Sequence, residues 1–157
     1  MGRGFDSRRE RHIPMEKILA TSVMIGNKAV LIQGDSGSGK SFLAMRLIYA
    51  YGAKLISDDV TLLNKHSDEL YANPVDEIKG QIEVRGVGIL RVPCVENIKV
   101  ACVIRLNEII PDRMPMDSIV SILGCKVPLF TFDAHFMYND IQVMSALHYL
   151  EQKDKIC

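Results

Sequence analysis

Residues 34–41 read GDSGSGKS and match the pattern G-x-x-x-x-G-K-[ST], which binds the phosphates of nucleotides. Glycines let the backbone turn so that successive N–H groups point at phosphate oxygens. The lysine brings a positive charge to the β- and γ-phosphates, and the hydroxyl of the last serine can ligate Mg²⁺. The pattern predicts an ATP site formed by Gly34, Asp35, Ser36, Gly37, Ser38, Gly39, Lys40 and Ser41.

The segments on either side of this loop favour that interpretation. Residues 29–33, AVLIQ, form a short apolar run typical of a strand buried on both faces. Residues 40–51 carry apolar side chains at spacings of three and four, which predicts an amphipathic helix, and Gly52 stands where it should end. The helix would point the positive end of its dipole at the phosphates. The alternative is a glycine-rich turn that binds nothing.

Two adjacent aspartates, Asp58 and Asp59, follow a short predicted strand over residues 54–57. A strand, a glycine loop, a helix and a second strand in succession are typical of a parallel crossover unit. The carboxyl ends of such strands lie at one edge of the sheet, so we expect both aspartates beside the bound phosphates. One carboxylate could hold Mg²⁺, and the other could accept a proton from an attacking hydroxyl. The alternative is a polar turn after a strand.

The rest of the pattern predicts one α/β domain over residues 15–157, with a mixed sheet and flanking helices. Strands are predicted at residues 18–25, 60–63, 69–72, 81–84, 101–106 and 126–132, a turn at 26–28, a loop at 111–117 and a final helix at 139–152. Residues 1–14 are polar and arginine-rich, and we expect an upstream extension that does not belong to the fold. The alternative is a basic arm that touches a partner.

The composition excludes several classes of protein. Lys plus Arg number 19 and Asp plus Glu number 19, tryptophan is absent, and no long basic stripe is visible, so we expect no nucleic-acid partner. No apolar run of about 18 residues is present, so we expect no membrane span. The cysteines form no C-x-x-C pair, which argues against a zinc site and favours reduced thiols in the cytoplasm.

The phosphate loop, the aspartate pair and residues 82–89, IEVRGVGI, occur together in an order that resembles HPr kinase/phosphorylase, in the short form that keeps only the catalytic domain. The resemblance runs from about residue 18 to about residue 113. It implies a P-loop core related to phosphoenolpyruvate carboxykinase and a hexameric assembly. The implied enzyme uses ATP and Mg²⁺ to phosphorylate a serine of the phosphocarrier protein HPr, and removes that phosphate by phosphorolysis.

The resemblance also implies roles for individual residues. Asp58 is the catalytic aspartate, Lys40 is the lysine of the phosphate loop, and Ser41 and Glu83 ligate Mg²⁺, which leaves Asp59 as a further metal candidate. Within DRM at residues 112–114, Arg113 corresponds to a catalytic arginine that would neutralise phosphoryl charge. The signature segment contributes Glu83, Arg85, Gly86 and Gly88. The alternative for Glu83, Arg85 and Arg113 is that they face solvent without a role.

The sequence departs from the family at two places. Leu19 stands where the family has a histidine that supports the catalytic aspartate, and residues 126–133, KVPLFTFD, replace a stretch tied to dephosphorylation. These departures motivate a second hypothesis, an ATP-binding regulator without catalysis. The carboxylates and the arginine argue against it, because a binder needs no base. A third hypothesis, a small-molecule kinase, lacks a recognisable second substrate pocket.

Overall fold

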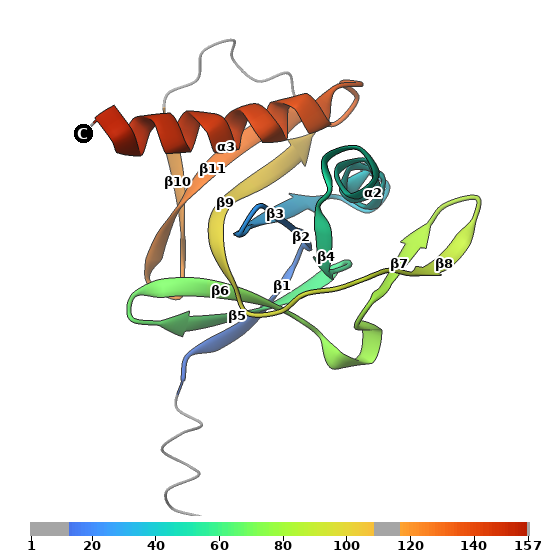
Figure 1. Ribbon diagram of the computed structural model, residues 1–157, viewed down its shortest axis with the longest axis horizontal. Coiled ribbons are helices and arrows are strands. Elements are labelled where there is room, and N and C mark those ends of the chain that lie inside the picture. The colour runs from blue at the N-terminus through green and yellow to red at the C-terminus, as the bar shows by residue number, and fades with distance from the viewer. Residues whose placement is uncertain (1–12, 109–116, 157) are drawn as a thin grey trace, which may run out of the picture.

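The computed structural model describes residues 13–108 and 117–156, and within them it has a curved mixed sheet with two helices on one side (Figure 1). The strands are β1 (Met15–Leu19), β2 (Thr21–Ile25), β3 (Lys28–Gly34), β4 (Lys54–Ser57), β5 (Val60–His66), β6 (Glu69–Pro74), β7 (Gln81–Val84), β8 (Gly88–Arg91), β9 (Ile98–Asn107), β10 (Ser118–Ile122) and β11 (Cys125–Asp133). The helices are α2 (Lys40–Tyr51) and α3 (Asn139–Ile156), with a 3₁₀ turn, η1, at Asp76–Ile78.

The main sheet has the strand order β1-β5-β6-β9-β3-β2-β4, with β11 beside β9 and β10 beside β11. Strands β3, β9 and β11 are parallel, whereas β2 is antiparallel to both β3 and β4. Strands β3 and β4 therefore run in the same direction with β2 between them. The expected crossover is present, and the loops that follow β3 and β4 leave the sheet at the same edge.

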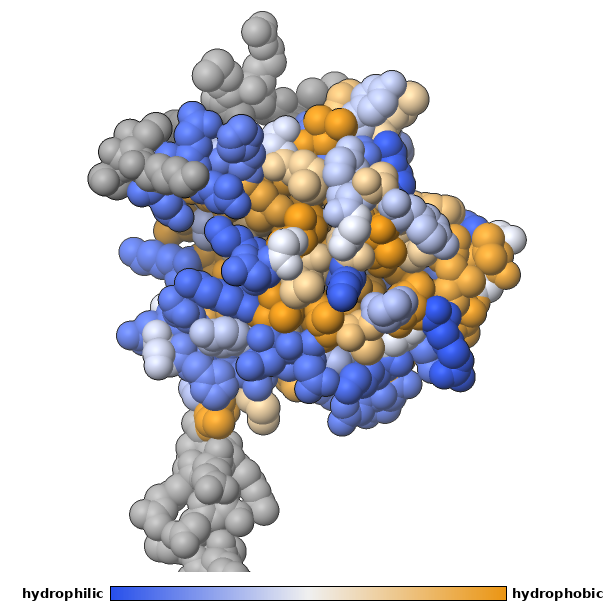
Figure 2. All heavy atoms as spheres, in the orientation of Figure 1, coloured by the Kyte–Doolittle hydropathy of each residue, from blue (hydrophilic) through white to orange (hydrophobic). Residues whose placement is uncertain are grey.

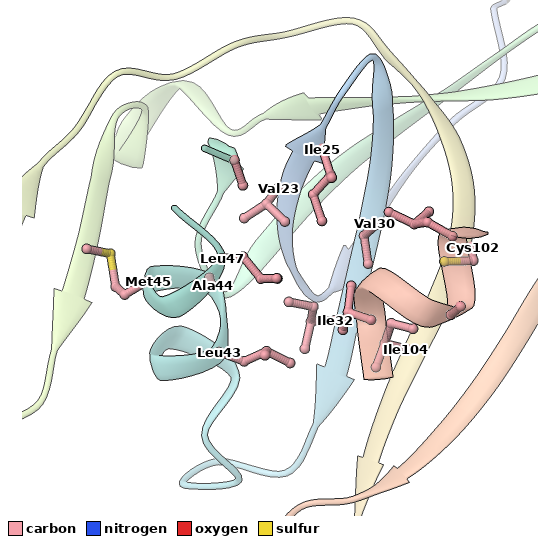
Figure 3. Packing of buried hydrophobic residues seen from close by; sticks show 14 of the residues in the cluster. Val23, Ile25, Val30, Ile32, Leu43, Ala44, Met45, Leu47, Cys102 and Ile104 are labelled. Carbon is pink, nitrogen blue, oxygen red and sulfur yellow. The ribbon is translucent and has the colours of Figure 1, made fainter. Parts of the chain in front are cut away.

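Strand β3 is buried on both faces, as its unbroken apolar run predicts. Val30 and Ile32 face the first core, which lies between the sheet and the helices, together with Leu43 and Leu47 of α2 (Figure 3). Apolar residues also gather across the middle of the face in Figure 2, between α3 and the polar β5–β6 hairpin.

The second core lies on the opposite face of β3, beneath Ala29 and Leu31. There the sheet curves so that β5 and β6 contribute Leu63 and Leu70. This curvature means that the central strands are covered by helices on one side and by the sheet's own outer strands on the other. The strand that carries the phosphate loop is consequently held from both faces.

Helix α2 begins at Lys40 directly after the loop and ends at Gly52, whose left-handed backbone (φ 71°) lets its N–H bond to the carbonyl of Leu47. Its C-terminal half is tied to α3. Arg46 lies 2.9 Å from Asp140, and the Tyr51 hydroxyl donates to the same carboxylate at 3.2 Å. Burial and then the negative charge of Asp140 raise the pKa of Tyr51 above its ordinary value. Among the described residues, neither helix is long and apolar enough to cross a membrane.

Most predicted elements are confirmed, and one is wrong. The stretch 18–25 is not a single strand, because it divides at Ala20 into β1, which pairs with β5, and β2, which pairs with β3 and β4. Ala20 donates its N–H to the carbonyl of Asp59 and accepts from the Thr61 hydroxyl at its own carbonyl. These two hydrogen bonds take the place of strand pairing at Ala20, between β1 and β2. An alternating pattern of apolar residues does not reveal them.

Other predicted boundaries shift. Strands β8 and β10 were not predicted, and the predicted final helix and last strand are both confirmed with longer bounds. The tight turn between β5 and β6 is confined to Ser67 and Asp68, both with positive φ. Pro14, placed in the extension by the sequence, accepts a hydrogen bond from Lys65 of β5. Residues 1–12 of the extension and residues 111–116 of the predicted loop lie outside the described residues.

Candidate active site

The phosphate loop has the close contacts that its glycines allow. A Cβ at Gly34 would lie 2.5 Å from the Ser38 hydroxyl and 3.0 Å from the carbonyl of Leu106, so a side chain cannot be accommodated there without a shift. Gly37 and Gly39 adopt φ of 83° and 96°, in the left-handed region that glycine enters without a steric cost. These conformations bend the chain from the end of β3 into the start of α2.

The start of α2 is arranged to receive an anion. Gly39 provides no side-chain cap, and the first turn carries no acidic residue, so its backbone N–H groups have no competing carboxylate from the helix. Lys40 donates to the carbonyls of Gly34 at 2.8 Å and Asp35 at 3.2 Å, which holds its ammonium over the loop. The loop therefore combines backbone donors, a helix dipole and a cation at one point.

Asp58 lies at the end of β4 and is the most enclosed carboxylate of this region, with 9% of its surface exposed. Its Oδ1 accepts from the Ser41 hydroxyl at 2.9 Å and from the Thr21 hydroxyl at 3.1 Å. Its Oδ2 accepts from the backbone N–H of Glu83 at 3.1 Å. The carboxylate is thus directly joined to the last residue of the phosphate loop.

The loop and the carboxylates face one cavity of about 310 Å³. Its lining is polar and carries both signs of charge. The lining residues are Ser36, Gly37, Gly39, Lys40, Ser41, Phe42, Asp58, Asp59, Glu83 and Arg85. Of the residues predicted for the phosphate loop, Gly34, Asp35 and Ser38 shape the loop but do not line the cavity. Phe42, which the sequence did not single out, is half exposed here, and only its place directly after the motif could have drawn attention to it.

The metal candidates are Ser41, Asp59 and Glu83, and all three line the cavity. Among the described residues, no three His, Cys, Asp or Glu side chains converge into a preformed metal cluster. Mg²⁺ commonly takes one or two protein oxygens and completes its shell with phosphate oxygens and water. A hydroxyl and separate carboxylates beside a phosphate loop fit that mode of binding. They do not fit a site in which protein groups supply every ligand of the metal.

The signature segment forms the β7–β8 hairpin, which lies beside α2 and apart from the main sheet (Figure 1). Gly86 and Gly88 have φ of 88° and 129°, which explains why glycine is needed in this turn. Neither lines the cavity, whereas Arg85 does, and its guanidinium would lie 3.9 Å from a Cβ placed on Gly37. The hairpin therefore brings a cation to the outer side of the phosphate loop.

One sequence-based candidate lies outside the described residues, and the two departures from the family do not line the cavity. Arg113 lies outside the described residues. Leu19 ends β1 with 74% of its surface exposed and does not line the cavity. Residues 126–133 form most of β11 within the sheet and contribute nothing to the lining.

Comparisons with known proteins cover most of the chain. The family model described as the HPr Serine kinase C-terminal domain matches residues 13–131, well over half of the chain. A solved structure titled Hpr(Ser) kinase/phosphatase from Coxiella burnetii superimposes with a TM-score of 0.77 at 25% identity, covering 89% of this chain and 99% of the other.

Two similar curated proteins are both called HPr kinase/phosphorylase. The one from Mycoplasmopsis pulmonis is 35% identical over 83 residues, which is 53% of this chain and 26% of the relative. The one from Streptococcus mutans is 42% identical over 64 residues, which is 40% of this chain and 20% of the relative. The chain therefore matches only about a quarter or less of the length of these relatives.

Proposed function

The chain belongs to the HPr Serine kinase C-terminal domain family, and from that premise we propose that it is an ATP-dependent kinase that phosphorylates a serine of an HPr-like phosphocarrier protein of the phosphotransferase system. The observation that carries the proposal is the hydrogen bond from the Ser41 hydroxyl to the Asp58 carboxylate. It connects the proposed nucleotide-binding loop to an enclosed carboxylate in one cavity. A site that only binds ATP has no need of a carboxylate beside the transferred group.

The proposed reaction is an in-line transfer. Asp58 takes the proton from the attacking serine hydroxyl, whose oxygen bonds to the γ-phosphorus while the bond to the β–γ bridging oxygen breaks, and ADP leaves. Lys40 and Arg85, on two sides of the loop, would balance the charge of the transferring group. Arg113 is a further candidate for this role on the strength of the family resemblance.

Ser41, Asp59 and Glu83 are proposed to hold Mg²⁺, which would neutralise the phosphate oxygens when it is bound. In the opposite direction, the protonated Asp58 would return its proton to the serine oxygen while inorganic phosphate takes the phosphoryl group and leaves as pyrophosphate. The names of the relatives, kinase/phosphorylase, support this second reaction.

We propose a cytoplasmic protein that forms a homo-oligomer, a hexamer by family resemblance, with no nucleic-acid partner. Support for the location comes from the free thiols of Cys94, Cys102 and Cys125, since reduced cysteines are typical of the cytoplasm. Support for the hexamer comes from the resemblance alone. Size-exclusion chromatography with light scattering would measure the assembly directly.

The test is transfer of a labelled γ-phosphate to a panel of HPr-type carriers with Mg²⁺ present, with Asp58→Asn run in parallel. We expect label on a carrier serine with the wild-type protein, and a loss of at least about 100-fold with the variant because it lacks the base. If ATP binds but no carrier is labelled, the kinase proposal fails, and an ATP-binding regulator on the same scaffold becomes the leading function. Transfer to a metabolite in place of a carrier would identify a small-molecule kinase.

A further inference from the structure

Thr21 is a buried residue whose hydroxyl contacts both Asp58 and Asp59. It begins β2 and has no exposed surface. Its Oγ1 donates to Oδ1 of Asp58 at 3.1 Å and accepts from the backbone N–H of Asp59 at 3.1 Å. One threonine hydroxyl thus binds a side chain and a main-chain group of two consecutive residues.

The backbone that Thr21 supports adopts an uncommon conformation. Asp59 has a φ of 68°, in the left-handed region that few residues other than glycine enter. We call the turn of the backbone at Asp58 and Asp59 the Asp58–Asp59 corner. Two further hydrogen bonds hold it, from the Ala20 N–H to the Asp59 carbonyl at 2.9 Å and from the Val60 N–H to the Asp58 carbonyl at 2.7 Å. Surrounding contacts stabilise a left-handed residue, and the Thr21 hydroxyl supplies the side-chain hydrogen bond to this one.

The hydrogen bonds of Asp58 distinguish its two oxygens. A carboxylate offers about four lone-pair positions, two on each oxygen. Oδ1 receives both hydroxyls, from Thr21 and Ser41, whereas Oδ2 receives only the Glu83 N–H. The one position left open by these bonds is on Oδ2.

We propose that Thr21 is a positioning residue, which saturates Oδ1 of Asp58 and fixes the Asp58–Asp59 corner so that Oδ2 takes the proton of the acceptor hydroxyl. This inference rests on the proposed function. Ser41 also donates to Oδ1, but its oxygen is the proposed ligand of Mg²⁺, so the position of this hydroxyl depends on the metal as well as on the carboxylate. Thr21 is held in the sheet and has no such second duty, so it is the constant donor during the reaction.

The chain offers a matched control on another strand of the sheet. Thr61 of β5 is equally buried, and its hydroxyl lies 2.8 Å from the Ser22 hydroxyl and donates to the Ala20 carbonyl at 2.8 Å. It makes no hydrogen bond to Asp58 among those found in the described residues. Replacing either threonine by valine removes one buried hydroxyl, and only the change at residue 21 removes a donor from the carboxylate.

The experiment compares Thr21→Val, Thr21→Ser and Thr61→Val in the transfer assay at saturating Mg·ATP and carrier. We expect Thr21→Val to lower kcat by about 10- to 100-fold, since small displacements of a catalytic group are costly, with the KM for ATP within about threefold of wild type. Thr21→Ser keeps the hydroxyl and should restore kcat to within about threefold, as should Thr61→Val. Equal kcat in the two valine variants, or no rescue by serine, would overturn the proposal. Thr21→Ala replaces Thr21→Val should the latter fail to fold.

A second measurement does not depend on activity. The Asp59 amide is bonded to Thr21, so its hydrogen exchange, followed by NMR, should be about tenfold faster in Thr21→Val than in Thr61→Val. Equal exchange would overturn the inference even if the kinase is active. If the wild-type protein labels no carrier, the proposed function fails, and the exchange rates still decide whether Thr21 holds the corner.

Discussion

The two halves of the cavity are built in different ways. The phosphate half consists of residues 34–41, one unbroken stretch that runs from the end of β3 into α2. The carboxylate half consists of Asp58 after β4 and Glu83 in β7, which are joined by the hydrogen bond between Asp58 Oδ2 and the Glu83 N–H. A third segment, β2, supplies Thr21 beneath them.

This difference indicates which half can function without the other. The phosphate half obtains its donors from its own backbone and a helix dipole, so it needs only β3 and α2 in place. The carboxylate half depends on three segments that are far apart in the chain. We therefore expect changes in the phosphate half to abolish nucleotide binding, and changes in the carboxylate half to spare binding and to reduce metal use or transfer.

The largest effect should follow from Lys40→Ala. Removing the ammonium that lies over the loop should weaken Mg·ATP binding by at least about 100-fold, because a charged partner of the phosphates is lost. Isothermal titration calorimetry measures the change. Lys54→Ala, at an exposed position at the start of β4, is the control and should bind normally. Unchanged affinity in Lys40→Ala would mean that the loop is not the nucleotide site.

Glu83→Gln should have the next largest effect, and it should act on the metal. Loss of one carboxylate should raise the Mg²⁺ concentration needed for half-maximal transfer by about tenfold, while binding of metal-free ATP stays the same. A Mg²⁺ titration of the transfer rate tests this, with exposed Glu77→Gln as the control. If Glu83→Gln weakens metal-free ATP binding as strongly as Lys40→Ala, the two halves do not work separately.

Leu19→His should have a smaller effect than these two substitutions, and it should raise the transfer rate where they lower activity. Residue 19 is exposed, and its neighbour Ala20 bonds to the Asp59 carbonyl, so the protein can accept an imidazole beside the corner. We expect transfer to rise by about tenfold, on the strength of the family resemblance, in which a histidine at this position supports the catalytic aspartate. Leu19→Gln, which is polar but does not titrate, should leave the rate unchanged. An equal rise in both variants would exclude a proton-transfer role.

The smallest effect on activity is expected at Cys102, which lies in β9 beside Val30 of β3. Burial raises the pKa of its thiol from 9.0 to about 12. The unfolded chain loses this proton above pH 9.0 whereas the folded chain keeps it, so this contribution to stability is complete below pH 9.0 and is lost as the pH rises toward about 12.

A thiol-specific reagent provides the measurement at Cys102, because only the thiolate reacts. At pH 8 the native protein should release no signal from this thiol, and unfolding in urea should reveal it. Cys102→Ala should show one reactive thiol fewer after unfolding and the same signal before it. Reaction of Cys102 in the native protein would show that the sheet opens between β9 and β3.

Much of the fold was predictable where structure depends on neighbours in sequence. Helix α2, strand β4 and the turn between β2 and β3 all follow from local patterns and are confirmed. The break at Ala20 was not predictable, because it depends on contacts with Asp59 and Thr61, some 40 positions away. Thr21 also gave no local signal, since a threonine in a strand is ordinary until a carboxylate is placed beside it.

The sequence by itself predicted the kind of chemistry from a phosphate loop, a pair of aspartates and a glycine-containing signature, each recognisable because it consists of adjacent residues. The tertiary structure alone decided how these parts meet. It placed Arg85 on the outer side of the loop, joined Ser41 to Asp58, and gave the two oxygens of Asp58 different partners. Such pairings arise from the order and curvature of the sheet, which bring distant segments to one edge, and no pattern of neighbouring residues records them.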